Sequence, residues 1–289
     1  MISKIYHDLS NKALTTTKRL EIISHAFLNK PYERGALGEG ESAEFDQSPL
    51  YRTDAFDCET FIDTVLALTL AKNLHQFKNF INKIRYKNGQ INFLYRNHFA
   101  ELDWNQNNHQ YLTDITTTFF NEKQELIAKF AITIINKPSW YQHLTINHIK
   151  INNIINNYDR QQLLTKLHNL SNQLPISTAT TPYLPFTQLF DQNGHANQFI
   201  FNQIPNGAII EIVRPNWELK NVIGTNLNIS HMGLIIKKNH QLFIRHASTI
   251  TNTVTDMDLI DYLAQARLNN TIKGINIHVV NPEFIYSSI

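Results

Sequence analysis

The hydrophobic residues of this chain change their spacing partway along it, and this change limits the folds that the chain can adopt. In the first part of the chain most clear patterns have helical spacing, as in Leu20, Ile23 and Phe27, while helix and strand signals are less clear through residues 105–160. Beyond about residue 207 they alternate with a period of two, which is typical of strands. Helices followed by strands are the pattern of the α+β class. We therefore expect a single α+β domain over residues 1–289, with helical insertions at roughly 74–175.

The same patterns predict the individual elements. A helix that begins at Cys58 aligns Phe61, Val65 and Leu68 on one face, and Asp57 is its expected N-cap. Further helices are expected at residues 17–29, 74–86, 158–173 and 256–267. Strands are expected at residues 91–95, 207–213, 231–236, 241–246 and 274–280, with an extended connector at 182–185. Because a short turn at residues 238–240 joins two of these strands, the sheet should be antiparallel.

Charge and hydropathy exclude several classes of function. The chain has 26 Lys and Arg residues against 24 Asp and Glu residues, and this net charge of +2 does not favour a nucleic acid or an anionic membrane surface as partner. Its longest apolar runs, at residues 65–71 and around 130–135, are far shorter than the ~18 residues of a transmembrane helix. Residues 38–43 (GEGESA) fit a dinucleotide-binding glycine pattern, but no strand precedes them. We expect no nucleic-acid partner, no transmembrane segment and no cofactor.

Cys58 is the only cysteine, which excludes an internal disulfide and a cysteine-rich zinc site. At the first turn of a helix, unpaired N–H groups and the helix dipole favour an anion, so we expect a thiol pKa below the usual ~8.5. His231 and His246 lie 15 residues apart on the two strands of the predicted hairpin, which can hold their rings side by side. A thiol, an imidazole and a third polar group together are typical of nucleophilic catalysis.

Other roles for these residues stay open at this point. Cys58 can be a small buried apolar residue, and each histidine can be an ordinary core or surface residue. His231 and His246 can also bind zinc together with a carboxylate. Asp57 and Glu59 are expected to act as an N-cap or a local partner rather than as a catalytic base.

Four short motifs carry a resemblance to a known superfamily. They are residues 31–35 (PYERG), 57–61 (DCETF), 230–234 (SHMGL) and 245–248 (RHAS). In this order they resemble the Tyr, Asp-Cys, His-x-Gly and His-Ala motifs of the NlpC-type papain-like cell-wall amidases and peptidases. The branch that is similar to this chain is the N-acetylmuramoyl-L-alanine amidase-like one, through residues 96–99 (RNHF), 103–104 (DW), 114–116 (DIT), 182–185 (PYLP) and 207–210 (GAII). One departure is that Glu59 and Thr60 follow the cysteine, where the superfamily commonly has Ser-Gly.

The resemblance implies a papain-like core, in which a helix carrying Cys58 packs on an antiparallel sheet carrying the histidines. It implies that the Cys58 thiolate attacks the lactyl carbonyl of N-acetylmuramic acid, that His231 protonates the leaving L-alanine nitrogen, and that His246 orients His231. The backbone N–H of Cys58 and the Tyr32 hydroxyl would stabilise the oxyanion. A substrate-binding role is implied for Arg96, His98, Asp103 and Trp104. For this cluster an ion pair beside a packed indole is the alternative.

The expected partner is therefore peptidoglycan or a muropeptide fragment, and the oligomeric state is left open. Three other functions are compatible with these residues: an endopeptidase that cuts between D-glutamate and diaminopimelate, a non-catalytic muropeptide-binding protein, and a transferase that passes the acyl group to an amine. The substrate class predicts the periplasm or cell envelope, reached by a signal that this sequence does not contain, with the cytoplasm as the alternative.

Overall fold

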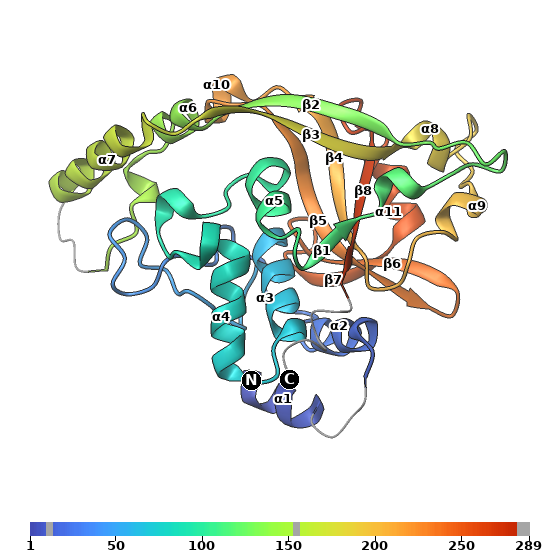
Figure 1. Cartoon of the computed structure of the whole chain (residues 1–289), viewed down its shortest axis with the longest axis horizontal. Coiled ribbons are helices and arrows are strands. Elements are labelled where there is room, and N and C mark those ends of the chain that lie inside the picture. Colours follow the sequence, from blue (N-terminus) through green and yellow to red (C-terminus); the bar gives the residue numbers. More distant parts are fainter. Residues whose placement is uncertain (10–13, 153–156, 282–289) are drawn as a thin grey trace.

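An antiparallel sheet forms the centre of the molecule (Figure 1). The computed structural model describes residues 1–9, 14–152 and 157–281. Within these residues eight strands form one sheet in the order β2-β3-β8-β4-β5-β6-β7, with β1 beside β8. The strands are β1 (Leu112–Asp114), β2 (Lys129–Asn136), β3 (Ile176–Pro185), β4 (Ile209–Trp217), β5 (Leu227–Lys238), β6 (Gln241–Ser248), β7 (Thr253–Asp258) and β8 (Gly274–Val280). The fold is thus a mixed α and β arrangement with an antiparallel sheet, as the change of period predicts.

The helices confirm the predicted helical segments and add several short ones. They are α1 (Ile2–Leu9), α2 (Thr16–His25), α3 (Cys58–Leu70), α4 (Leu74–Arg85), α5 (Asn105–Asn107), α6 (Lys137–Gln142), α7 (Asn157–Ser171), α8 (Phe186–Leu189), α9 (Gln198–Phe201), α10 (Lys220–Ile223) and α11 (Leu259–Ala266). A π-helical turn covers Ala100–Trp104, between α4 and α5. None of the helices in the described ranges has both the length and the apolar character that crossing a membrane requires.

Alternation along the strands builds a separate core on each face of the sheet. On one face, Ile209 and Leu234 pack with the apolar side of α3. On the other face, their neighbours Ile210 and Ile235 pack with α11. Each of these four side chains is at most 1 % exposed, and burial of such a side chain contributes about 1.5–3 kcal/mol. The sheet therefore holds α3 and α11 in fixed positions on its two sides.

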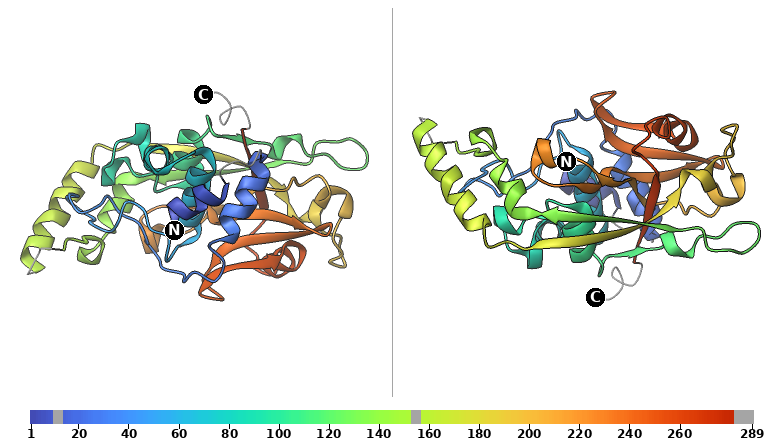
Figure 2. Two further views of the ribbon diagram at one scale, coloured as in Figure 1. Left: turned by 90° about the horizontal axis from the view of Figure 1, so that it is seen from below. Right: turned by 90° about the horizontal axis from the view of Figure 1, so that it is seen from above.

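Strands β2 and β3 form a long ribbon that runs from α6 and α7 at one end of the molecule to α8 at the other (Figures 1 and 2). Only the last residues of β3 join the main sheet, where Leu184 pairs with Ile275 of β8. The predicted connector at 182–185 is thus the end of a strand.

Two expectations about the middle of the chain are wrong. Residues 91–95 do not form a strand, because the Asn92 side chain accepts a hydrogen bond from the Leu94 N–H and closes a 3₁₀ turn over Phe93–Tyr95. The segment 74–175 is also not purely helical, since it contains β1 and β2. In β2 the apolar residues Phe130, Ile132 and Ile134 are more than half exposed and alternate with buried residues. Because β2 carries apolar residues on both of its faces, its sequence lacks the alternation of apolar and polar residues by which a strand is recognised.

Candidate active site

Cys58 is the first residue of α3, and a capping box fixes this end of the helix. The Asp57 side chain accepts a hydrogen bond from the Thr60 N–H at 2.9 Å, and the Thr60 hydroxyl accepts one from the Asp57 N–H at 2.9 Å. Asp57 Oδ2 also accepts from the Gly35 N–H at 2.9 Å, which ties the preceding loop to the helix. The predicted N-cap role of Asp57 is confirmed, and Thr60 completes the box.

His231 and His246 meet across strands β5 and β6. His231 Nε2 lies 2.6 Å from His246 Nδ1, and the ring centroids are 4.8 Å apart at an interplanar angle of 80°. The β5–β6 pairing starts at Leu234 and Arg245, and the same register continued would place His246 opposite Gly233, two residues from His231 on β5. The side-by-side placement that the hairpin spacing predicts is present.

One pocket of about 120 Å³ brings the cysteine and the first histidine together. Cys58, Glu59 and His98 line it together with the β5 segment from Ser230 to Met232. The backbone N–H groups of Met232 and Glu59 face the Cys58 thiol and act to lower its pKa. Met232, the neighbour of His231 on β5, thus lies close to the thiol at the first turn of α3.

The expectation of a depressed thiol pKa is wrong for this resting conformation. Burial, together with the negative charges of Asp57 and Glu59, raises the pKa of Cys58 to about 12. The hydrogen bonds from the two backbone N–H groups lower it, but by less than burial and the two carboxylates raise it. The thiol is therefore neutral before substrate arrives.

Both imidazoles are also neutral at rest. Burial and then the neighbouring His246 lower the pKa of His231 to about 3. Burial lowers the pKa of His246 to about 4, although Asp256 opposes this shift. A neutral imidazole is the form that accepts a proton.

Two tyrosines lie within electrostatic reach of the sulfur. Burial and then the charge of Cys58 raise the pKa of Tyr32 and the pKa of Tyr262. The Tyr262 ring on α11 lies 5.3 Å from the His246 ring and 6.3 Å from the His231 ring, centroid to centroid. Sequence reasoning missed Tyr262, because its position on a predicted amphipathic helix does not show which strands that helix covers.

Among the four residues expected to bind substrate, His98 lines the pocket. Arg96 binds the carboxylates of Glu39 and Asp46, with its side chain 15 % exposed. Asp103 pairs with Lys137. Trp104 is fully buried and donates its indole N–H to Asp63 at 2.7 Å, so no face of its ring is available to a ligand.

Two glutamates, Glu59 and Glu101, are also among the residues that line this pocket. Burial, with Asp63 and Asp57, raises the pKa of Glu59 well above its usual value. Burial raises the pKa of Glu101 to about 7, while Glu101 accepts a hydrogen bond from the Asn228 N–H at 2.5 Å. Sequence reasoning missed Glu101, although the π-helical turn that carries it is a backbone feature often found at functional sites.

The described residues contain no group of three or more His, Cys, Asp and Glu side chains that could hold a metal ion. The third ligand that a zinc site at His231 and His246 requires is therefore not provided by the carboxylates described here. What these residues offer chemically is a thiol, a neutral base hydrogen-bonded to a second imidazole, and hydroxyl and backbone donors around one small pocket.

Known proteins are similar to this chain over nearly its whole length. A family model described as AmiA-like, N-acetylmuramoyl-L-alanine amidase-like, matches residues 22–272. A solved structure from Legionella pneumophila, assigned to the family model DUF1460, is 45 % identical with a TM-score of 0.94, covering 97 % of this chain and 93 % of that one. No curated protein sequence matches the chain.

Two structures from Bacteroides are more distant and show likeness of fold alone. An N-acetylmuramoyl-L-alanine amidase from Bacteroides uniformis is 23 % identical with a TM-score of 0.62, covering 92 % of this chain and 99 % of that one. A Bacteroides fragilis protein described as a candidate xylanase is 22 % identical with a TM-score of 0.60, covering 89 % of this chain and 98 % of that one.

Proposed function

Because the chain belongs to the AmiA-like family of N-acetylmuramoyl-L-alanine amidase-like proteins, we propose that it hydrolyses the amide bond between the lactyl group of N-acetylmuramic acid and L-alanine. Cys58 is the nucleophile in this proposal, on a papain-like arrangement of the NlpC type. The observation that carries it is a single pocket lined by both Cys58 and His231, with His231 hydrogen-bonded to His246. The substrate is peptidoglycan or a soluble fragment of it, met in the periplasm or cell envelope.

The contact between the histidines determines which nitrogen of His231 is the base. His231 Nε2 faces His246 Nδ1, so the other nitrogen, Nδ1, is left for the thiol. For Nδ1 to accept a proton, neutral His231 must carry its own proton on Nε2 and donate it to His246. In this tautomer His246 holds the ring of His231 in the orientation that catalysis requires.

The resting protonation states favour proton transfer that accompanies attack. As the Cys58 sulfur bonds to the lactyl carbonyl carbon, its proton passes to His231 Nδ1. His231 then gives this proton to the leaving L-alanine nitrogen, and the C–N bond breaks. Water attacks the remaining thioester with His231 as base, which releases the lactyl carboxylate and regenerates the thiol.

Backbone and hydroxyl donors supply the oxyanion site. The Cys58 N–H is at the first turn of α3, where backbone donors have no partner within the helix. Together with the Tyr32 hydroxyl, it would stabilise the charge on the carbonyl oxygen, and one such donor is typically worth about 10²–10³ in rate.

In this proposal most of the cluster at residues 96–104 supports the wall of the pocket and does not contact the substrate. His98 contacts the substrate directly because it lines the pocket, where its ring packs against Trp140. Arg96, Asp103 and Trp104 hold the wall in place through their buried partners. We assign them a positioning role in substrate binding.

Product identification tests this function. Purified anhydro-muropeptides and disaccharide muropeptides are incubated with the protein and analysed by mass spectrometry. Release of the intact L-alanine stem peptide and of a sugar with a free lactyl carboxylate is expected. A shortened sugar-peptide would make the protein a D-glutamyl-diaminopimelate endopeptidase, and an adduct formed only with an added amine would make it a transferase.

A further inference from the structure

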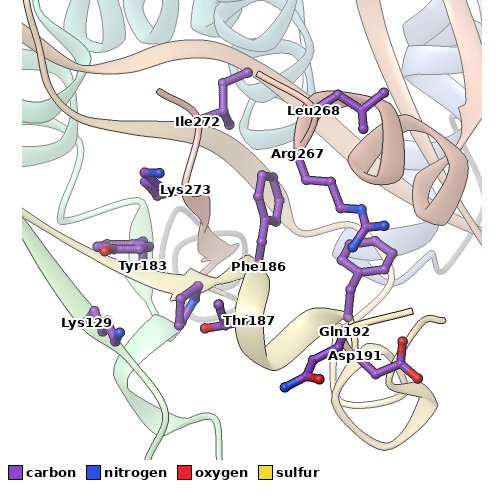
Figure 3. Close-up of a pocket in the computed structure, with 12 residues that line it drawn as sticks. Lys129, Tyr183, Phe186, Thr187, Asp191, Gln192, Arg267, Leu268, Ile272 and Lys273 are labelled. Carbon is purple, nitrogen blue, oxygen red and sulfur yellow. The ribbon is translucent and has the colours of Figure 1, made fainter. Parts of the chain in front are cut away.

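A second and larger pocket lies away from the cysteine, where β2 begins and β3 ends (Figure 3). Its volume is about 720 Å³, within the ~300–1,000 Å³ typical of sites for small ligands. The backbone fixes its walls, because Lys129 pairs with Tyr183 across β2 and β3, and Phe186 donates its N–H to the Lys273 carbonyl at 2.8 Å.

Aromatic side chains form the apolar part of this pocket. Tyr183, Phe186 and Phe190 all line it, and the Phe186 and Phe190 rings meet edge to face at 6.3 Å. Tyr183 and Phe186 are only partly buried, so each presents ring surface to the pocket. Flat apolar rings beside polar groups are a suitable surface for the C–H face of a sugar ring.

Three cations surround these rings. Lys129 and Lys273 lie on one side of Phe186 and Arg267 lies on the other (Figure 3). The Arg267 guanidinium is 5.2 Å from the centre of the Phe190 ring. No ion pair joins any of the three cations to a carboxylate of the described residues, and the one carboxylate of the pocket, Asp191, binds His195.

A glycine makes room for the arginine. A Cβ atom at Gly194 would lie 2.3 Å from Arg267 Nη2, and the residue has a φ of +90°. The positive φ favours glycine at this position, and a larger residue would also require the end of the Arg267 side chain to move. The guanidinium of Arg267 thus lies beside the loop that follows Asp191.

We propose that this pocket is a binding site for an acidic saccharide, with a sugar ring on Tyr183 and Phe186 and its carboxylates on Lys129, Lys273 and Arg267. The inference rests on the proposed function in one respect, namely that a muropeptide is the acidic saccharide this protein meets. Guanidinium and ammonium groups with no carboxylate partner bind carboxylates through charge-assisted hydrogen bonds.

A small apolar cluster lies between the new pocket and the pocket that contains Cys58. Tyr183 packs against a small cluster formed by Ala131, Val213 and Ile229. Ile229 also lines the pocket that contains Cys58. Tyr183 thus packs on the same apolar cluster as Ile229, which lies two residues before His231 on β5.

Binding is tested by titration calorimetry in the Cys58→Ala background, which prevents turnover. The probe is the disaccharide tetrapeptide that a muramidase releases from peptidoglycan, and neutral chitotetraose is its uncharged counterpart. We expect two binding sites for the probe. The Lys129→Gln/Lys273→Gln double variant should weaken the second site at least about tenfold, and Tyr183→Leu should weaken it similarly. Lys4→Gln, at an exposed lysine on α1, is the control for loss of a surface lysine and should leave binding of the probe unchanged.

The failure of this inference and the failure of the proposed function give different results. If the wild-type protein releases stem peptide but the double variant binds the probe like its parent, the second site is refuted and the amidase stands. If the wild-type protein cleaves nothing but binding depends on the two lysines, the amidase is refuted and the second site stands. Binding of chitotetraose as tight as binding of the probe would also overturn the role of the cations.

Discussion

His231 Nε2 lies 2.6 Å from His246 Nδ1, and this contact leaves a single nitrogen of His231 for the thiol pocket. His231 lies on β5 and His246 lies on the neighbouring strand β6, and this placement in the central sheet restricts the movement of either ring. His246 Nε2 is buried without a hydrogen-bond partner among the described residues, and the Tyr262 ring packs edge-on against this imidazole at 5.3 Å. The orientation of His231 thus depends on one hydrogen bond and on aromatic packing.

Replacing His246 by alanine should reduce turnover without abolishing it. The variant keeps Cys58 and the base but loses the hydrogen bond that orients His231, and we expect kcat to fall by about 10–10². Steady-state kinetics of stem-peptide release measures this, with His75→Ala on the exposed face of α4 as control. Inactivity equal to that of Cys58→Ala would mean that His246 takes part in the chemical step itself.

Replacing Asp57 by asparagine should make the thiol more reactive. The asparagine oxygen still caps α3, but the negative charge that raises the pKa of Cys58 is removed. Because Cys58 is the only cysteine, iodoacetamide alkylation reports on this thiol alone. We expect the midpoint of its pH profile to move down, with roughly three- to tenfold faster alkylation at pH 8. Glu41→Gln, at an exposed position, should leave the profile unchanged, and a wild-type midpoint below ~8.5 would contradict the raised pKa of the Cys58 thiol.

The fold should lose stability in acid because of its buried imidazoles. His246 is 2 % exposed and its pKa is lowered to about 4, whereas a histidine in the unfolded chain titrates near 6.5. Between these values only the unfolded chain binds the proton, so the free energy of unfolding falls as the pH falls from about 6.5 to about 4. The slope is at most about 1.4 kcal/mol per pH unit for this residue. Urea unfolding at a series of pH values should show a shallower slope for His246→Gln, and identical slopes would rule out this contribution.

The two tyrosine hydroxyls near the sulfur should differ in their effect on rate. If Tyr32 donates to the oxyanion, Tyr32→Phe should lower kcat by about 10–10² with little change in KM, because the interaction forms only in the transition state. Tyr262→Phe keeps the ring that packs on the histidines and should remain close to wild type. A larger loss in Tyr262→Phe than in Tyr32→Phe would move the oxyanion role to Tyr262.

Local sequence signals predicted the parts of the site that depend on a single element or on one hairpin. Asp57 and Cys58 begin a helix whose apolar face is continuous, and the β5–β6 turn fixes the spacing of His231 and His246. These features depend on neighbours in the chain, so spacing alone places them.

Contacts between distant segments could not be predicted in this way. Tyr262 contacts the histidines because α11 packs on the second face of the sheet. Trp104 is buried where its indole N–H donates a hydrogen bond to Asp63 on α3. The thiol pKa was misjudged for the same reason, since burial by surrounding elements outweighs the N–H groups of its own helix. Strand β2 was missed because Phe130 and Ile132 are exposed apolar residues.

The most direct test of the central claim compares stem-peptide release by the wild-type protein and by Cys58→Ala under identical conditions, with and without a chelator. Circular dichroism and thermal unfolding establish that both proteins are folded. The account predicts release by the wild-type protein that a chelator does not change, and no release above background by Cys58→Ala. Undiminished release by folded Cys58→Ala would contradict thiol catalysis.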